Sequence, residues 1–227
     1  MKRFVRKVRS AIRLYRDRKH LRADLALAIR HVRDLAWIYA RRPNDEVAYY
    51  NLLFAVAMAA QPAVIVELGT GPGLSSLAFV RVLQYIRQTQ PTLQPVLHSC
   101  DINPMALAPL KRFGSIVHLH TMSSDDLAAH WATDAPAIYL LYIDAAHSHE
   151  QSLADFEHFS QWVRPNGLIL LHDTFPRSER DEAPCASGSV WKTVQYVKAH
   201  YPNEFEVMTI PHLAGVSLLR RRGAKYF

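Results

Sequence analysis

Residues 63–76, AVIVELGTGPGLSS, determine the fold of this chain. The run begins with four apolar residues, three of them β-branched, which predicts a short buried strand. Gly69, Gly71 and Gly73 then allow a tight turn with positive φ and a close approach to a ligand. From Leu74 the apolar residues recur at helical spacing, so the turn leads into the N-terminus of a helix. A strand, a glycine turn and a helix N-terminus predict a nucleotide-sized binding site.

The spacing of the glycines separates two classes of nucleotide. A dinucleotide-binding G-x-G-x-x-G sequence would need glycine at position 74, where this chain has leucine. Instead Glu67 precedes the first glycine by two residues, and its charge would repel a diphosphate but suit an ammonium group or hydroxyls. The segment resembles the first motif of class I S-adenosylmethionine-dependent methyltransferases. The alternative is a glycine-rich turn of an ordinary α/β protein.

Composition indicates a globular enzyme. With 227 residues, 49% of them hydrophobic, the chain can bury one sizeable core, most simply a catalytic domain with an appendage. Its two cysteines, Cys100 and Cys185, match neither a disulfide framework nor a zinc motif, which favours a reducing compartment. We find no apolar run of membrane-spanning length and no signal-peptide pattern, so we expect a cytoplasmic protein.

Charge is concentrated at the N-terminus. Residues 1–42 contain 14 Lys and Arg against three acids, a net charge of +11, whereas the other 185 residues contain 13 against 17, a net charge of −4. Apolar spacing predicts helices near 4–15 and 22–40, the second ended by Arg-Arg-Pro-Asn, and a packed helix at 46–60. We therefore expect a basic helical arm or cap over 1–60 and an S-adenosylmethionine-binding domain over 61–227.

Three roles compete for the basic arm. It can pack on the core as a cap with a solvated basic face, bind a membrane or another anionic surface, or join subunits of a homo-oligomer. Nucleic-acid binding has weaker support because aromatic residues are not interleaved in a stacking pattern.

From residue 63 strand-like and helix-like runs alternate. The pattern predicts strands near 63–68, 95–101, 115–119, 137–144 and 167–172 and helices near 74–88, 104–113, 123–131 and 149–163. A further helix at 189–200 and a closing hairpin at 205–210 and 215–220 follow. This order implies an α/β fold: a Rossmann-like doubly wound sheet, mostly parallel with a C-terminal antiparallel hairpin, preceded by the N-terminal helices.

Polar residues lie where the second and third strands are expected to end. Asp101 ends the second strand, where a carboxylate can accept both hydroxyls of a ribose. Ser123 or Ser124 could cap the next helix and meet an adenine edge. Because ligands gather at the carboxyl ends of parallel strands, we expect a nucleoside across these ends.

Two further strand ends bring acids and histidines. Asp144 is followed by His147 and His149, and His172 stands beside Asp173 and Thr174 in the sequence HDT. Carboxylates on adjacent strand ends converge within metal-coordination reach, and oxygen ligands suit Mg²⁺. A nearby histidine could take a proton from a hydroxyl whose pKa the ion lowers. We expect His149 to be an ordinary surface residue.

The segment IDAAHSHEQSLADFEHFSQWVRPNGLILLHDT extends the resemblance to residues 60–220. It is similar to the metal-dependent, catechol O-methyltransferase-like group, and more particularly to enzymes of cephalosporin and macrolide-sugar methylation. The resemblance implies that Asp144 and the pair His172–Asp173 surround Mg²⁺ and that His147, three positions after Asp144, is the general base. It also implies S-adenosylmethionine contacts, at residues Glu67, Gly69, Gly71, Gly73, Ser75, Asp101 and Ser123.

Two departures concern the third metal ligand. His172 stands where the antibiotic-tailoring relatives have an acid, and Thr174 where catechol-type enzymes have an asparagine. We expect methyl transfer to a hydroxyl of a small molecule or sugar, with the loop at 175–188, including Arg177 and Arg180, bordering the acceptor. The alternatives are a non-catalytic S-adenosylmethionine-binding or regulatory protein, or a domain that its basic arm recruits to an anionic surface.

Overall fold

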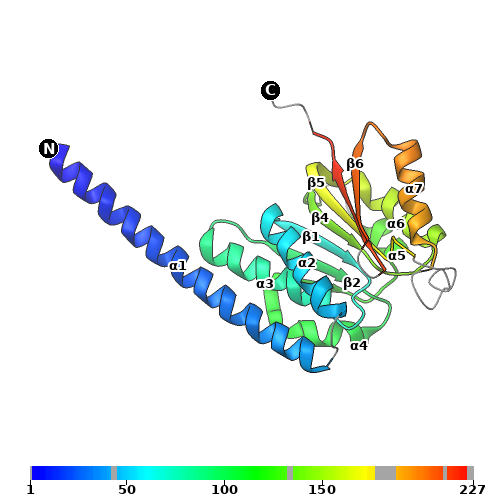
Figure 1. The fold of residues 1–227 in the computed structure, drawn as a ribbon, viewed down its shortest axis with the longest axis horizontal. Helices are drawn as coiled ribbons and strands as arrows, with labels where there is room; N and C mark the ends of the chain where they lie inside the picture. Colours follow the sequence, from blue (N-terminus) through cyan, green and yellow to red (C-terminus); the bar gives the residue numbers. More distant parts are fainter. Residues whose placement is uncertain (1, 42–44, 132–134, 177–187, 212–213, 224–227) are drawn as a thin grey trace.

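The computed structural model describes residues 2–41, 45–131, 135–176, 188–211 and 214–223. They form a seven-stranded sheet in the order β3-β2-β1-β4-β5-β7-β6, with helices on both faces (Figure 1). The strands are β1 Val64–Leu68, β2 Val96–Cys100, β3 Val117–His120, β4 Ile138–Ile143, β5 Val163–His172, β6 Phe205–Ile210 and β7 Val216–Arg221. The helices are α1 Lys2–Arg41, α2 Asp45–Ala60, α3 Leu74–Thr89, α4 Pro104–Leu107, the 3₁₀ helix η1 Ala108–Ile116, α5 Ser124–His130, α6 His149–Ser160 and α7 Val190–His200.

The sheet has the topology that the sequence predicts. Strands β1 to β5 are parallel, and β7 pairs antiparallel with both β5 and β6. β1 pairs with β2 on one side and with β4 on the other, so the strand order reverses beside β1. Ligands of open α/β sheets bind at such a reversal, beyond the carboxyl ends of the strands. The predicted Rossmann-like fold is confirmed.

Each face of the sheet has its own apolar core. On one face α1, α2 and α3 cover the sheet, and α2 contributes Tyr50, Leu53 and Ala57 to the buried cluster. On the other face α5, α6 and α7 pack over residues such as Phe156 and Phe159. The packing of α2 against the same core as α3 places the end of the N-terminal segment next to the glycine turn.

The N-terminal helices differ from the prediction. Residues 2–41 form one continuous helix, α1, where the sequence predicts two. The interval between the two predicted helices, residues 16–21, contains neither proline nor glycine, so nothing in it interrupts the backbone hydrogen bonds. The N-terminal half of α1 extends beyond the rest of the structure (Figure 1).

Three other boundaries need correction. The helix predicted at 104–113 is a four-residue α4 followed by η1, since Pro109 lacks an amide hydrogen for the α-helical pattern. Gly114, with φ 57°, kinks η1, which continues to Ile116, and β3 begins at Val117 and not at 115. The helix predicted to reach 163 ends at Ser160, and β5 begins at Val163 with a register shift opposite β4.

A histidine cluster at the β2–β3 edge makes stability depend on pH. His98 Nδ1 lies 3.1 Å from His120 Nε2, and burial, followed by the neighbouring imidazoles His120 and His118, lowers the pKa of His98 to about 4. As pH falls from about 6.5, the unfolded chain binds protons that the folded chain resists, so the free energy of unfolding decreases. Between about pH 7 and 5 we expect the free energy of unfolding to decrease by about 1–2 kcal/mol less in His98→Gln than in wild type.

Urea unfolding at the two pH values measures this difference. His200→Gln, at an exposed position of α7, is the control. An equal loss of stability on acidification in wild type and His98→Gln would contradict the assignment.

Candidate active site

The glycine turn packs closely against the end of β4. Gly69, Gly71 and Gly73 have φ values of 87°, 48° and 78°, in the left-handed region that favours glycine. Gly69 donates its amide hydrogen to the Cys100 carbonyl at 2.9 Å, and a Cβ on Gly69 would collide with the main chain of Asp144. Gly73 precedes α3 as its N-cap. The turn therefore joins three strand ends at the reversal of the sheet.

Glu67 lies beneath this turn and not in a cavity. Its side chain is fully buried, and its carboxylate accepts hydrogen bonds from Ser75, Ser76 and Ser99 at 2.6, 2.5 and 2.5 Å. Three hydroxyls from α3 and β2 surround the carboxylate, and contact of Glu67 with a ligand stays a prediction. Burial raises the pKa of Glu67 to about 7, although the three hydroxyls lower it. The residue links β1, β2 and the start of α3.

Glu67→Gln is expected to change how stability depends on pH. Because the folded-state pKa is above the unfolded value of 4.5, the folded chain binds an extra proton between about pH 4.5 and 7. This contribution to stability is present at low pH and is lost as pH rises through 7. From about pH 5 to 8 the variant should gain about 2–3 kcal/mol relative to wild type.

Urea unfolding of wild type and Glu67→Gln at about pH 5 and about pH 8 measures this difference in the free energy of unfolding. Glu157→Gln, on the exposed face of α6, serves as the control. A constant difference between wild type and Glu67→Gln across the range would show that the carboxyl group does not titrate there.

Asp101 connects the turn to two adjoining cavities. Its Oδ2 accepts the amide hydrogens of Thr70 and Gly71 at 3.0 and 3.1 Å, and its Oδ1 accepts that of Asn103 at 2.8 Å. Asp101 also lines both cavities, together with Gly69. The carboxylate thus lies where the two cavities adjoin, and its contact with a ribose stays a prediction.

The first cavity, of about 210 Å³, lies over β2 and the start of α5. Ser123 and Ser124 line it, as the sequence predicts, and so do Met122 and Gln151. Ser123 caps α5 by accepting the amide hydrogen of Asp126 at 3.0 Å, so it both begins the helix and borders the cavity. Apolar walls with a few polar edges suit a nucleobase.

The second cavity, of about 360 Å³, contains the predicted chemistry. It is bounded by the glycine turn, the end of β4 and α2. The predicted residues that line it are Gly69, Gly71, Ser75, Asp101, Asp144, His147 and His172. Gly73 and Glu67 do not line it. The seven residues come from four segments that only the parallel sheet brings together.

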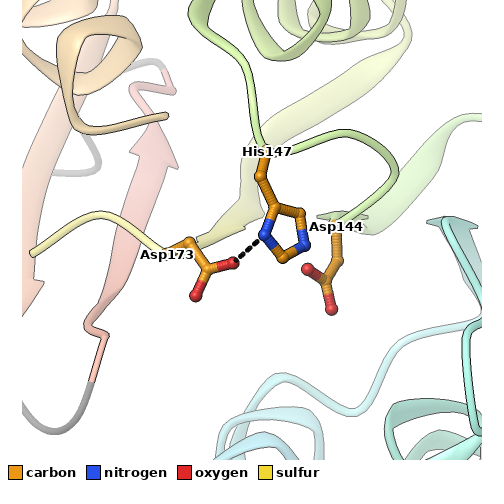
Figure 2. A group of neighbouring side chains, drawn as sticks. All are labelled: Asp144, His147 and Asp173. Atoms are coloured by element: carbon orange, nitrogen blue, oxygen red, sulfur yellow. Dashed lines mark ion pairs between the residues drawn. The ribbon is translucent and has the colours of Figure 1, made fainter. Parts of the chain in front are cut away.

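Asp144, His147 and Asp173 form a cluster at the strand ends (Figure 2). Each offers one ligand atom, and these atoms lie within 4.8 Å of one another. His147 Nδ1 lies 3.1 Å from Asp173 Oδ2, and the His147 side chain is 40% exposed whereas that of Asp173 is 6% exposed. Asp173 has φ 57°, a strained conformation for a non-glycine residue, which is typical of functional sites.

His172 contacts both carboxylates of this cluster. Its Nδ1 lies 3.2 Å from Asp144 Oδ1 and 3.2 Å from Asp173 Oδ1. Burial lowers the pKa of His172, but the two carboxylates outweigh burial and raise it to about 10. Tyr142 donates its hydroxyl to Asp144 Oδ2 at 3.0 Å. The imidazole thus carries positive charge at neutral pH between the two acids.

Two predicted residues lie elsewhere. Thr174 is buried and accepts a hydrogen bond from Ser217 at 2.9 Å, and it lines a separate cavity beside α7. Among the described residues, the structure does not bring Thr174 into the acidic cluster. His149 is half-buried, with Nδ1 2.8 Å from Thr193 Oγ1, so it is a packing residue and not the surface residue that we expect.

The loop predicted to border the acceptor is described only at its ends. Residues 177–187, with Arg177 and Arg180, lie outside the described residues. At the C-terminal end of the loop, Ser189 donates its amide hydrogen to the His147 carbonyl at 3.1 Å. A Cβ on Gly188 would also meet this carbonyl. The end of the loop therefore fixes the main chain of His147.

Sequence reasoning missed the contribution of α2. Glu46, Tyr49 and Tyr50 line the second cavity from this helix. The edge of the Tyr49 ring packs against His172, with centroids 4.3 Å apart. Burial, Asp173 and Asp144 raise the pKa of Tyr49 to about 12. In the sequence these three residues are spaced at i, i+3 and i+4. This spacing places them on one face of a helix and was the signal that could have indicated a shared surface.

Comparison with known proteins gives matches to methyltransferases. Residues 66–174 match a family model described as a methyltransferase domain. Structural matches include the S-adenosylhomocysteine-bound methyltransferase PaMTH1 of Podospora anserina, at 18% identity over 85% of this chain and 88% of that chain, with a TM-score of 0.61. Residues 66–174 thus resemble a methyltransferase domain, and the chain shares its fold with these methyltransferases.

Two named O-methyltransferases have the same fold. TomG of Streptomyces achromogenes, in complex with S-adenosylmethionine, matches at 16% identity over 87% of this chain and 90% of that chain, with a TM-score of 0.61. An enzyme of Bacillus cereus, in complex with S-adenosylhomocysteine, matches at 13% identity over 87% and 91%, with a TM-score of 0.63. No curated protein matches the sequence.

Proposed function

We propose that the protein transfers the methyl group of S-adenosylmethionine to a hydroxyl of a small molecule or sugar. The observation that carries this proposal is the His147–Asp173 contact of 3.1 Å at the wall of the second cavity, beside Asp144. A histidine oriented by a carboxylate is suited to taking a proton from a hydroxyl. The fold shared with two O-methyltransferases supports the same reaction.

His147 acts as the general base. When Asp173 accepts a hydrogen bond from the Nδ1 proton, the proton-accepting lone pair of the ring is on Nε2. The acceptor hydroxyl gives its proton to this nitrogen while its oxygen forms the new C–O bond to the methyl group. The C–S bond breaks, and its electron pair returns to sulfur, leaving S-adenosylhomocysteine.

The two cavities fit the methyl donor. Ser123 borders the part that suits adenine, Asp101 the ribose, and the glycine turn with Ser75 the methionine part. When bound, S-adenosylmethionine supplies a reactive sulfonium methyl, so the residues act mainly by positioning and deprotonation. Gly69 packs against the main chain of Asp144, so the glycine turn proposed to bind the methyl donor lines the same cavity as His147.

The acidic cluster fits a divalent cation. Asp144 and Asp173 would hold Mg²⁺, which prefers carboxylate oxygens and would lower the pKa of a bound hydroxyl. His172 contacts both acids, and we propose that its imidazolium balances their charge and positions them. We leave Thr174 out of this ligand set. Its hydroxyl accepts a hydrogen bond from Ser217, and the residue lines a separate cavity beside α7.

Removal of the metal tests this mechanism. Methyl transfer to a panel of phenols, sugars and other hydroxylated molecules is measured with a radiolabelled methyl donor, before and after treatment with a chelator. We expect chelation to reduce turnover at least tenfold, an order-of-magnitude expectation for loss of a charge-stabilising ion, and Mg²⁺ to restore it. Full activity in chelator would assign the cationic role to the His172 imidazolium and overturn the metal proposal.

The alternative is a protein that binds S-adenosylmethionine without transferring the methyl group. Calorimetric binding of the donor with no methylated product from any hydroxylated acceptor would favour it. We place the reaction in the cytoplasm on the basis of cysteine use: Cys100 is buried, and Cys185 lies outside the described residues.

A further inference from the structure

Helix α1 has a row of large apolar side chains that does not face the domain. These five residues are between 52% and 66% exposed and recur at intervals of three, four or seven positions. At 100° per residue this spacing places them on one face of the helix. We call this face the apolar stripe: Leu21, Leu25, Ile29, Val32 and Tyr39.

The apolar stripe is additional to the face that packs on the domain. Ala23, Leu27 and Ile38 are buried, with 6%, 9% and 1% exposure, on the other side of the same helix. One apolar face is sufficient to dock a helix on a protein core. A second exposed apolar face of five large residues marks a surface that binds something else.

Arginines border the apolar stripe along one edge. Arg22, Arg30 and Arg33 each directly follow a residue of the stripe, so all three are turned about 100° from it in the same direction. Arg30 and Arg33 also line a cavity of about 420 Å³ between α1 and α3, which Arg112 of η1 lines as well. The edge of the stripe thus leads into an arginine-lined cavity.

The acid in this cavity is already neutralised. Asp34 accepts hydrogen bonds from Arg81 Nε and Nη2 at 2.6 and 3.0 Å, and from the Tyr50 hydroxyl at 3.0 Å. Arg30, Arg33 and Arg112 therefore add positive charge that Asp34 does not balance. Arginine pairs with phosphate through its planar fork of donors, so the cavity suits phosphate groups.

Charge also decides between two occupants of the apolar stripe. A second copy of the chain would bring another segment of net charge +11 against the first, since residues 1–42 contain 14 basic and three acidic residues. An anionic surface is attracted by the same charge. No described helix is both long and apolar enough to cross a bilayer. A helix with an apolar face edged by arginine lies along a membrane surface.

We propose that α1 docks the protein on a bilayer containing anionic phospholipid. The apolar stripe enters the boundary of the acyl chains, and Arg22, Arg30 and Arg33, with the adjoining cavity, contact lipid phosphates. The N-terminal half of α1 extends beyond the domain in Figure 1, and residues 2–19 of the sequence contain nine Lys and Arg, which add to the positive charge of this segment.

Vesicle flotation of the full chain tests the proposal. Vesicles of phosphatidylcholine alone are compared with vesicles in which roughly one lipid in three is phosphatidylglycerol. We expect the protein to float only with the second kind, and binding to weaken at least about tenfold when salt rises from about 0.1 to 1 M.

Two double variants separate the parts of the surface. Leu25→Ser with Val32→Ser should reduce vesicle binding at least about tenfold, because both side chains leave water on docking. Arg30→Gln with Arg33→Gln should reduce it about tenfold and also reduce its salt dependence. Met208→Ser, which replaces an exposed apolar residue of β6, and Arg164→Gln on β5 are the matched controls and should bind as wild type does.

Three results would overturn the proposal. The first is equal binding to both kinds of vesicle, and the second is a pair of double variants that bind like wild type. The third is a dimer, seen by sedimentation equilibrium without lipid, that the stripe substitutions dissociate while vesicles do not bind, which would assign the stripe to a second copy. Circular dichroism checks that the variants keep the helical content of wild type.

Discussion

Asp144→Asn is expected to reduce methyl transfer by about a hundredfold to a thousandfold while leaving the affinity for S-adenosylhomocysteine within about threefold. The substitution removes one negative charge from the cluster with His147 and Asp173. It keeps an oxygen that can accept the Tyr142 hydroxyl, which lies 3.0 Å from Asp144 Oδ2. The fold and the two cavities should therefore be preserved while the charge that would hold the proposed cation is lost.

The measurement for Asp144→Asn combines turnover with calorimetry. Titration with S-adenosylhomocysteine reports donor binding, and the methyl-transfer assay with and without chelator reports chemistry. Glu157→Gln, which removes an exposed carboxylate from α6, should behave as wild type in both. An Asp144→Asn protein that keeps near wild-type turnover in chelator would show that neither the carboxylate nor a metal assists the reaction.

Gly69→Ala is expected to lower the affinity for S-adenosylhomocysteine at least about a hundredfold, since both the backbone conformation and the space at this position exclude a Cβ. Gly69 has φ 87°, and a Cβ there would overlap the Asp144 carbonyl and the Ala145 Cα. The turn would have to move away from β4. Such a shift widens the junction between the two cavities and displaces the amides of Thr70 and Gly71 from Asp101.

Gly114→Ala is the matched control for Gly69→Ala. Gly114 also has a positive φ, 57°, but a Cβ there would have no atom within 4 Å. Gly114→Ala should therefore lose only about 1–2 kcal/mol of stability, from the backbone strain, and bind S-adenosylhomocysteine as wild type does. Equal affinities of the two variants for S-adenosylhomocysteine would show that the close approach of the turn to β4 is not needed for binding.

The sequence predicts the fold well because local patterns suffice for it. The apolar strand, the three glycines and the helical spacing from Leu74 lie within one short stretch. The alternation that follows allows few topologies once right-handed crossovers are assumed. Asp144 could be placed at a strand end because it directly follows an apolar run, and Asp101 because it follows the strand-like VLHSC. Boundaries failed where a single residue, such as Pro109 or Gly114, altered a helix.

The direction of side chains could not be predicted in the same way. Glu67 precedes a glycine turn, and nothing local shows whether its carboxylate faces a ligand or the interior. The structure answers this through Ser76 and Ser99, which are nine and 32 residues away. Thr174 directly follows Asp173, yet successive residues at a strand end point in different directions. Such contacts depend on long-range packing.

The position of His172 illustrates a further limit. Its sequence neighbour Asp173 suggests a metal ligand, but the structure places the imidazole 3.2 Å from two carboxylates. Whether a histidine coordinates a cation or is itself the cation depends on its distance from each acid. Those distances follow from the pairing of β4 with β5, which aligns Ile143 with Leu171.

The wall formed by α2 has a consequence for how substrate choice is encoded. The segment that matches the methyltransferase domain, residues 66–174, contains the donor turn and the acidic cluster, whereas Glu46, Tyr49 and Tyr50 precede it. One side of the second cavity is thus formed by a separate stretch of 16 residues, Asp45–Ala60. Exchanging this helix between related chains is therefore expected to change the shape of the second cavity while leaving the cluster of Asp144, His147 and Asp173 in place.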